Sequence, residues 1–166
     1  MHSDTYFQCA KLYEHPKVVE KLGQSLAKKL EGIEFDTIIS PAIGAIIMGF
    51  ETAKQADKRF LFVERKDGVL QLRRDYCLVE GEKVVIVEDV ITTARTINET
   101  LDAIKEFNAE VVSVACIVDR TKGQTPYSIT SLLQVEPVTY SSEDCPLCQE
   151  GLPLVKPGSR EAKVGA

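Results

Sequence analysis

Two patterns of hydrophobic residues alternate along the chain: apolar residues at helical spacing, which predict helices, and short apolar runs, which predict strands. From Pro16 to Leu30 apolar residues recur at helical spacing, with Pro16 suited to the first turn and Gly32 just past the end, which predicts an amphipathic helix. Short apolar runs rich in β-branched residues predict strands. These runs cover 36–40, 59–64, 83–88, 111–118 and, more weakly, 129–135. Further helices are predicted from the turn at Pro41–Gly44 to about Ala56, and from Thr93 or Thr96 to Asn108.

The repeated order of strand and helix predicts an α/β fold with an open, mainly parallel β-sheet flanked by helices and right-handed crossovers. Val84–Val87 is continuous enough for a strand buried on both faces. Between Arg65 and Tyr76 the sequence shows neither helical nor strand periodicity, which predicts a mobile loop. Asp67–Gly68 allows a hairpin turn within this loop. The proline-containing tail, 143–166, is predicted to be irregular.

Length and charge narrow the class of protein. With 166 residues and 44% hydrophobic content, residues 1–166 are expected to form a single domain. A net charge of -5 argues against general affinity for nucleic acid or an anionic membrane, so an anionic ligand needs a local basic cluster. The chain has neither a long apolar run nor a signal-peptide pattern, and a cytoplasmic protein is expected.

Five cysteines are an odd number in a chain of this size, so reduced thiols are expected. Cys9, Cys77 and Cys116 have apolar or aromatic neighbours and are predicted to be buried. Cys145 and Cys148 form a lone Cys-x-x-Cys. A zinc site needs four ligands, and both histidines are distant in sequence, which favours structural thiols, with a metal shared between subunits as the alternative.

The segment Val84–Glu99 carries the strongest functional pattern. Glu88 and Asp89 come at the carboxyl end of the strand predicted at 83–88, where ligands bind in parallel sheets. The next residues turn into a helix whose N-terminal amides suit a phosphate, and Thr96 with Glu99 fits a capping box. This turn consists of Thr92, Thr93, Ala94, Arg95 and Thr96. A ribose 5-phosphate fits, with its hydroxyls on the acidic pair and its phosphate on the turn. The alternative is an ordinary strand end followed by an ordinary helix cap.

The whole string resembles the phosphoribosyl pyrophosphate motif of the type I phosphoribosyltransferases, in which two acidic residues precede a Thr-Thr-Gly loop. Ala94 stands where that family usually has Gly, and would cost about 1 kcal/mol if a positive φ were needed. The resemblance extends over nearly the whole chain and points to the orotate phosphoribosyltransferases. The matching stretches are 2–8, 40–44, 64–65, 72–74, 118–120, 145–148 and 154–160.

The resemblance implies roles for residues outside the acidic pair. The turn Ala42, Ile43 and Gly44 would hold pyrophosphate through its amides, and Arg120 with Thr92 would contact orotate. Tyr6 and Phe7 would stack over the base from a partial hood, 1–15, that lacks the family's upstream residues. A basic loop would close over the pyrophosphate, commonly from the neighbouring subunit of a homodimer. It carries Arg65, Lys66, Arg73 and Arg74.

Each of these features has a plain structural alternative: an ordinary strand-to-helix turn, a strand-end arginine, a core aromatic pair or a solvated loop. The resemblance implies an enzyme, a pentosyltransferase of de novo pyrimidine (UMP) biosynthesis. It would transfer ribose 5-phosphate from phosphoribosyl pyrophosphate to orotate, giving orotidine 5-monophosphate and pyrophosphate. Mg²⁺ would be held through the pyrophosphate and the ribose hydroxyls rather than directly by the protein. Transfer to another base, a non-catalytic sensor of the same fold and an inactive fragment are the alternatives.

Overall fold

The structure is a computed structural model that describes residues 2–155. It divides into two compact units, one formed by residues 9–135 and the other by the described parts of 1–8 and 136–166. The single domain spanning 1–166 and the partial hood at 1–15 stay predictions.

A six-stranded sheet forms the larger unit, with the strand order β3-β2-β1-β4-β5-β6. The strands are β1 (Thr37–Pro41), β2 (Arg59–Lys66), β3 (Val69–Leu72), β4 (Lys83–Ile91), β5 (Glu110–Asp119) and β6 (Ile129–Gln134). All neighbouring strands are parallel except β3, which is antiparallel to β2. The predicted fold class, an open and mainly parallel α/β sheet, is therefore confirmed.

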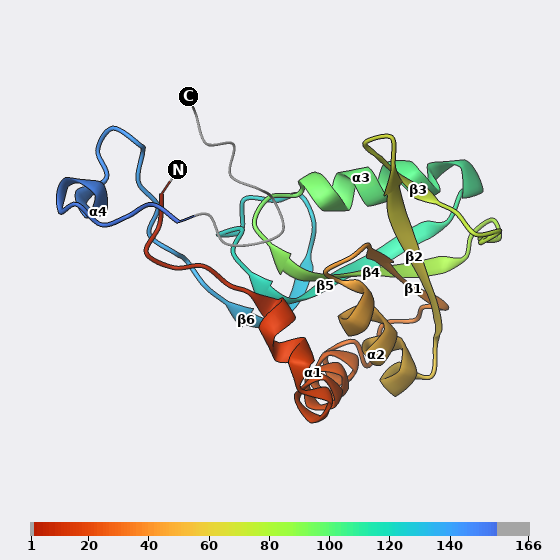
Figure 1. The fold of residues 1–166 in the computed structure, drawn as a ribbon. Coiled ribbons are helices and arrows are strands. Elements are labelled where there is room, and N and C mark those ends of the chain that lie inside the picture. Colours follow the sequence, from red (N-terminus) through yellow and green to blue (C-terminus); the bar gives the residue numbers. More distant parts are fainter. Residues whose placement is uncertain (1, 156–166) are drawn as a thin grey trace. The chain divides into compact units, whose positions relative to one another are not determined.

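Helices cover both faces of this sheet. Helices α1 (Pro16–Lys29) and α2 (Ile46–Ala56) lie on one side, and α3 (Arg95–Ile104) lies on the other (Figure 1). Two short 3-10 helices, η1 (Cys9–Glu14) and η2 (Lys105–Phe107), precede α1 and follow α3. The helix predicted from Pro16 is confirmed, since α1 begins at that residue. Its apolar stripe faces the core and supplies the buried side chains Val19 and Leu26.

The strand β4, predicted to be buried on both faces, lies at the centre of the core. Val84–Val87 is fully buried, and β4 pairs with β1 on one side and β5 on the other. On β1, the helix α2 approaches closely because position 49 is glycine. A Cβ atom on Gly49 would stand 1.9 Å from the Oγ of Ser40 and 2.9 Å from the ring of Phe60. The absence of a side chain there fixes how near α2 lies to the sheet.

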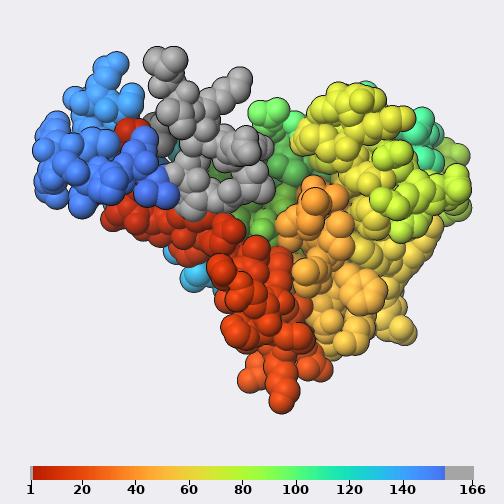
Figure 2. Space-filling view, viewed as in Figure 1, coloured from red at the N-terminus to blue at the C-terminus, as the bar shows by residue number. Residues whose placement is uncertain are grey.

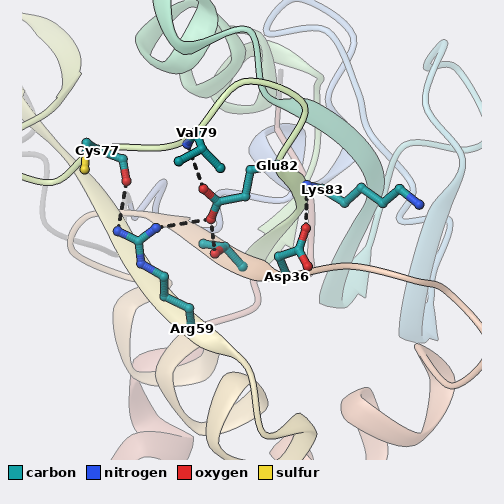
Figure 3. A network of polar contacts seen from close by, with 7 residues as sticks. Asp36, Arg59, Cys77, Val79, Glu82 and Lys83 are labelled. Atoms are coloured by element: carbon teal, nitrogen blue, oxygen red, sulfur yellow. Dashed lines mark hydrogen bonds and ion pairs between the residues drawn. The ribbon is translucent and has the colours of Figure 1, made fainter.

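A buried carboxylate joins the amino-terminal ends of β1, β2 and β4 (Figure 3). Glu82, only 8% exposed, accepts hydrogen bonds from the Thr37 hydroxyl, the Arg59 guanidinium and the backbone N–H of Val79. Arg59 also donates to the carbonyl of Cys77 at 2.8 Å. This network stabilises the end of the sheet opposite to the carboxyl ends of the parallel strands.

The segment predicted as a loop from Arg65 is a β-hairpin over most of its length. Strand β2 continues to Lys66, and β3 returns antiparallel to it after a turn at Asp67 and Gly68. Both turn residues have positive φ, 51° and 85°, as the tight turns that suit hairpins require. The pairing was not visible in the sequence because β3 has only four residues, and the charged residues Arg65, Lys66 and Asp67 that precede it interrupt the alternation of apolar and polar positions.

The smaller unit has its own short elements. His2 and Tyr140 exchange two backbone hydrogen bonds of 2.9 Å, and α4 (Pro146–Gln149) forms one helical turn. The prediction of an irregular tail is therefore wrong at α4 and confirmed for 143–145 and 150–155, which form neither helix nor strand, while 156–166 lies outside the described residues. All five cysteines are free thiols, but Cys77 is exposed rather than buried as predicted. Within residues 2–155 no helix is both long enough and apolar enough to cross a membrane.

Candidate functional site

The strand order creates a crevice between β1 and β4. From these two neighbours the chain leaves in opposite directions, through α2 to β2 and through α3 to β5. Ligands of open α/β sheets bind beyond the carboxyl ends of the strands at such a switch point. The residues that follow β1 are the turn 42–45, and those that follow β4 are 92–94. The topology thus brings together two of the segments predicted to hold phosphates.

Gly44 and Asp89 show how closely these segments approach. A Cβ atom on Gly44 would lie 3.2 Å from the Oδ2 atom of Asp89. In Figure 2 the orange surface, which includes this turn, meets the green surface near residues 90–100. The turn is joined to the sheet by a 2.7 Å hydrogen bond from the N–H of Ala42 to the carbonyl of Val63, and the peptide bond between Ala42 and Ile43 is cis.

Glu88 and Asp89 both lie within β4, which extends three residues beyond its predicted end at Glu88 because pairing with β5 continues to Ile91. Glu88 is buried, and this burial, followed by the neighbouring Asp89 carboxylate, raises its pKa well above the usual value. Asp89 is half-buried, and its Oδ1 accepts a 2.7 Å hydrogen bond from the N–H of Val90. The pair therefore combines a carboxyl group that favours its protonated form with a more accessible one.

The turn after β4 has the hydroxyl-rich character that the sequence predicted, but a different helix start. Thr92 and Thr93 are exposed, and α3 begins at Arg95 with Ala94 as the N-cap, which makes no side-chain capping bond. The predicted capping box at Thr96 is wrong, because Glu99 binds Arg65 and Arg95 instead. Without a capping side chain, the N-terminal end of α3 suits an anion.

Ala94 carries no backbone penalty. Its φ is -72°, a value that any L-residue adopts, so the glycine usual at this place is not needed for conformation. The anticipated loss of about 1 kcal/mol does not arise.

Arg120 follows β5 at the same edge of the sheet. Its N–H donates a 2.8 Å hydrogen bond to the carbonyl of Ile91, the last residue of β4, so the two strand ends are joined there. This hydrogen bond sets Arg120 beside the backbone that enters Thr92. The residues predicted to contact the base thus come from adjoining strand ends.

The basic residues of the hairpin are paired with carboxylates. Arg65 contacts Glu99 of α3 and donates to the carbonyl of Gly68. Arg73 and Arg74 both bind Glu64, at 3.2 and 3.0 Å. The Arg74 guanidinium also lies over the ring of Phe62, with 5.5 Å to the ring centroid. Lys66 is exposed at the end of β2. Arg65 is therefore directed toward α3, whereas Arg73 and Arg74 are held by their own hairpin.

Two residues near the acidic pair were not found from the sequence. Cys9 and Tyr13 lie in η1, and the pKa of Cys9 is raised to about 12 by burial and then by Asp89 and Glu88. Burial and Asp89 likewise raise the pKa of Tyr13, whose buried hydroxyl has no hydrogen-bond partner among the described residues. Only tertiary structure reveals that this short helix lies near the acidic pair.

Tyr6 and Phe7 belong to the smaller unit, where Tyr6 is exposed and Phe7 is half-buried. Their stacking on the base stays a prediction.

Comparison with known proteins identifies the family. Residues 8–140 match the family described as phosphoribosyl transferase domain. The chain therefore belongs to the phosphoribosyltransferases. Within that family it is similar to the orotate phosphoribosyltransferases. It is 44% identical to the one from Caldanaerobacter subterraneus subsp. tengcongensis over 162 residues, covering 96% of this chain and 85% of the relative. It is 42% identical to the one from Thermotoga maritima over 164 residues, covering 98% and 88%.

Solved structures support the fold. Adenine phosphoribosyltransferase from Thermoanaerobacter pseudethanolicus has a TM-score of 0.70 at 23% identity, covering 78% of this chain and 88% of that one. Orotate phosphoribosyltransferase from Aeropyrum pernix has a TM-score of 0.68 at 19% identity and 82% coverage of both chains. At these identities the likeness concerns the fold alone.

Proposed function

We propose that this chain transfers ribose 5-phosphate from phosphoribosyl pyrophosphate to orotate, giving orotidine 5-monophosphate and pyrophosphate. The observation that carries the proposal is the close approach of Gly44 to Asp89 at the crevice between β1 and β4. It brings a turn rich in small residues next to the acidic pair and the hydroxyl-rich turn. The identity to orotate phosphoribosyltransferases supports the choice of base.

The reaction is a displacement at the anomeric carbon. A ring nitrogen of orotate forms a bond to that carbon as the bond to the pyrophosphate oxygen breaks, and the electron pair leaves with pyrophosphate. Positive charge develops on the sugar, and the Asp89 carboxylate is available to offset it while accepting hydrogen bonds from the ribose hydroxyls. The buried Glu88 would hold the ribose in place, which lowers the entropic part of the barrier. No protein nucleophile is required.

The 5-phosphate would bind the N-terminal end of α3 through the turn Thr92–Thr96, and the pyrophosphate would bind the amides of Ala42–Gly44. Arg65, directed toward α3, would add a fixed positive charge. For Arg73 and Arg74 to reach pyrophosphate, they must exchange their single contacts with Glu64 for phosphate oxygens, which can accept two hydrogen bonds from one guanidinium group. Arg120, with Thr92, would bind the carboxylate of orotate.

Mg²⁺ belongs to this proposal as a partner of the substrate. It prefers oxygen ligands and keeps several waters, so a site of phosphates, ribose hydroxyls and nearby carboxylates suits it, and the accessible Asp89 carboxylate fits that donor set. When bound, it would neutralise charge on the leaving pyrophosphate.

A homodimer is also proposed, because apolar side chains are exposed around α2. Ile43 is 85% exposed, and Ile47 and Phe50 are 46% and 55% exposed. An apolar group of this kind on one face suits contact with a second copy. A cytoplasmic location stays a prediction.

Pyrophosphate release measured separately with orotate, adenine and other bases tests the activity. Orotate alone should support turnover, and Asp89→Asn should lower kcat/KM at least about 100-fold, the loss typical of one electrostatic group at a reacting centre. Asp102→Asn, an exposed change on α3, is the matched control. The Arg120→Ala variant should no longer bind orotate but should still bind phosphoribosyl pyrophosphate. Turnover with a purine but not orotate, or a fully active Asp89→Asn, would overturn the assignment.

A further inference from the structure

Three metal-ligating side chains meet in the smaller unit. The ligand atoms of His2, Cys145 and Cys148 all lie within 4.8 Å of one another, and the Sγ atom of Cys148 is 3.2 Å from Nδ1 of His2. The sequence favoured structural thiols because a histidine partner was far away along the chain. The structure supplies that partner from the other end of the chain.

Backbone pairing brings the histidine to the cysteines. His2 and Tyr140 form an isolated antiparallel bridge, and the Ser3 hydroxyl donates a 2.8 Å hydrogen bond to the carbonyl of Val138. These contacts hold the first residues against the segment that leads into α4, so the position of His2 is set by hydrogen bonds and not by chance approach of side chains.

A single turn fixes the two cysteines. Cys145 is the N-cap of α4 and is 1% exposed, and its carbonyl accepts hydrogen bonds from the N–H groups of Cys148 and Gln149, each 3.1 Å. Cys148 is exposed. The turn therefore presents one buried and one accessible thiol to the same imidazole.

We propose that His2, Cys145 and Cys148 bind one zinc ion that joins the two ends of the chain within this unit. Two thiolates and one imidazole bind Zn²⁺ in preference to Mg²⁺ or Ca²⁺, which favour oxygen ligands. With Zn–S of about 2.3 Å and Zn–N of about 2.0–2.1 Å, tetrahedral ligand atoms lie roughly 3.5–3.8 Å apart. The one contact of 3.2 Å and the upper limit of 4.8 Å for all three atoms lie close to that range, so small side-chain rotations complete the geometry.

Within residues 2–155 three side chains are grouped as ligands, which leaves a fourth position of this site for another ligand. The three side chains line a cavity of about 400 Å³ that Asp4 and Tyr6 also line. A water molecule fills the remaining position of a zinc ion that has three protein ligands. Because the described part of this unit contains only one short helix and one isolated bridge, metal binding would contribute directly to its folding.

Metal analysis of the full chain tests the proposal. The protein is purified under reducing conditions with any affinity tag removed, loaded with zinc, freed of excess metal and measured by elemental mass spectrometry; about one zinc per chain is expected. Cobalt loading should give the intense thiolate-to-cobalt absorption that marks sulfur ligands. Cys148→Ser and His2→Gln should each weaken zinc binding at least about tenfold. Cys77→Ser, at an exposed thiol of the larger unit, and His15→Gln are matched controls and should bind zinc like the parent.

The spectrum of cobalt in the unaltered chain decides the question even if a variant fails to fold. Absence of the thiolate band together with no retained zinc would overturn the proposal. A second contrary result would combine two observations: the protein isolated without reductant has a mass lower by two hydrogens, and the reduced protein takes up no metal. Together they would overturn the proposal, because they would identify Cys145 and Cys148 as a redox pair instead. Equal zinc affinity in the parent and both ligand variants would also overturn it.

Discussion

Gly44 lies against the carboxylate of Asp89, where a single added carbon would stand 3.2 Å from Oδ2. A contact this short forces the carboxylate or the turn to move by a few tenths of an ångström. Because both are proposed to contact the same substrate, Gly44→Ala should raise KM for phosphoribosyl pyrophosphate about tenfold while changing the free energy of unfolding by less than about 1 kcal/mol. Steady-state kinetics and urea unfolding check the two parts, and an unchanged KM would separate Gly44 from the substrate site.

Glu88 should make stability depend on pH. A carboxyl group whose pKa is raised by folding stabilises the native state below its ordinary pKa of 4.5, and this contribution is lost as pH rises through the raised value. Glu88→Gln stays neutral, so its stability relative to the parent should increase as pH rises from about 4.5 toward neutrality. Urea unfolding across this range measures the difference. The exposed Glu80→Gln is the control, and a Glu88→Gln difference that stays constant with pH would contradict the prediction.

Glu64 competes with any anion for Arg73 and Arg74. Glu64→Gln should therefore tighten binding of inorganic pyrophosphate about three- to tenfold, measured by calorimetry, if these arginines serve the leaving group. Stability should change by less than about 1 kcal/mol, because both arginines are substantially exposed, with side-chain exposures of 42% and 58%.

The control for this variant is Glu14→Gln. It breaks the exposed pair with Lys11 and changes the net charge by the same amount, so long-range electrostatic effects are matched. Weaker pyrophosphate binding in Glu64→Gln alone would mean that Glu64 orients the arginines rather than competing for them.

Gly49→Ala should destabilise the chain by about 1–3 kcal/mol, the range for overpacking a well-packed core. The new methyl group would overlap the Ser40 hydroxyl, which is itself buried without a hydrogen-bond partner among the described residues. Ser40→Ala should consequently cost little and should restore part of the loss when combined with Gly49→Ala. Chemical denaturation of the two single variants and the double variant tests this coupling; strictly additive losses would show that the hydroxyl is not the obstacle.

The sheet could be predicted because its signal is local. Val84–Val87 is apolar at every position, and such a run is stable only where both faces are covered. Its end could not be predicted, since β4 continues through Glu88 and Asp89 by pairing with β5, an interaction between segments far apart in sequence. The capping box failed for the same kind of reason, because Arg65, 34 residues away, binds Glu99.

The parts of the candidate site that consist of consecutive residues could be predicted from the sequence. The parts that depend on contacts between distant segments could not. The acidic pair and the turn that follows it form one continuous string, and Arg120 directly follows a buried strand. Tyr13 reaches the neighbourhood of Asp89 from a short helix with no distinguishing pattern. The meeting of His2 with Cys148 depends on a bridge across 138 residues, from His2 to Tyr140.

The carboxylates that hold the hairpin arginines have a consequence for how tightly a ligand can bind. Residues that are loose before binding must be immobilised by the ligand, and that loss of freedom subtracts from affinity. Here the strand pairing from Val63 to Leu72 and the contacts of Glu64 and Glu99 already restrict the hairpin. A ligand therefore meets a hairpin whose backbone was ordered when the protein folded, so less freedom is lost on binding than if an unpaired loop had to be ordered.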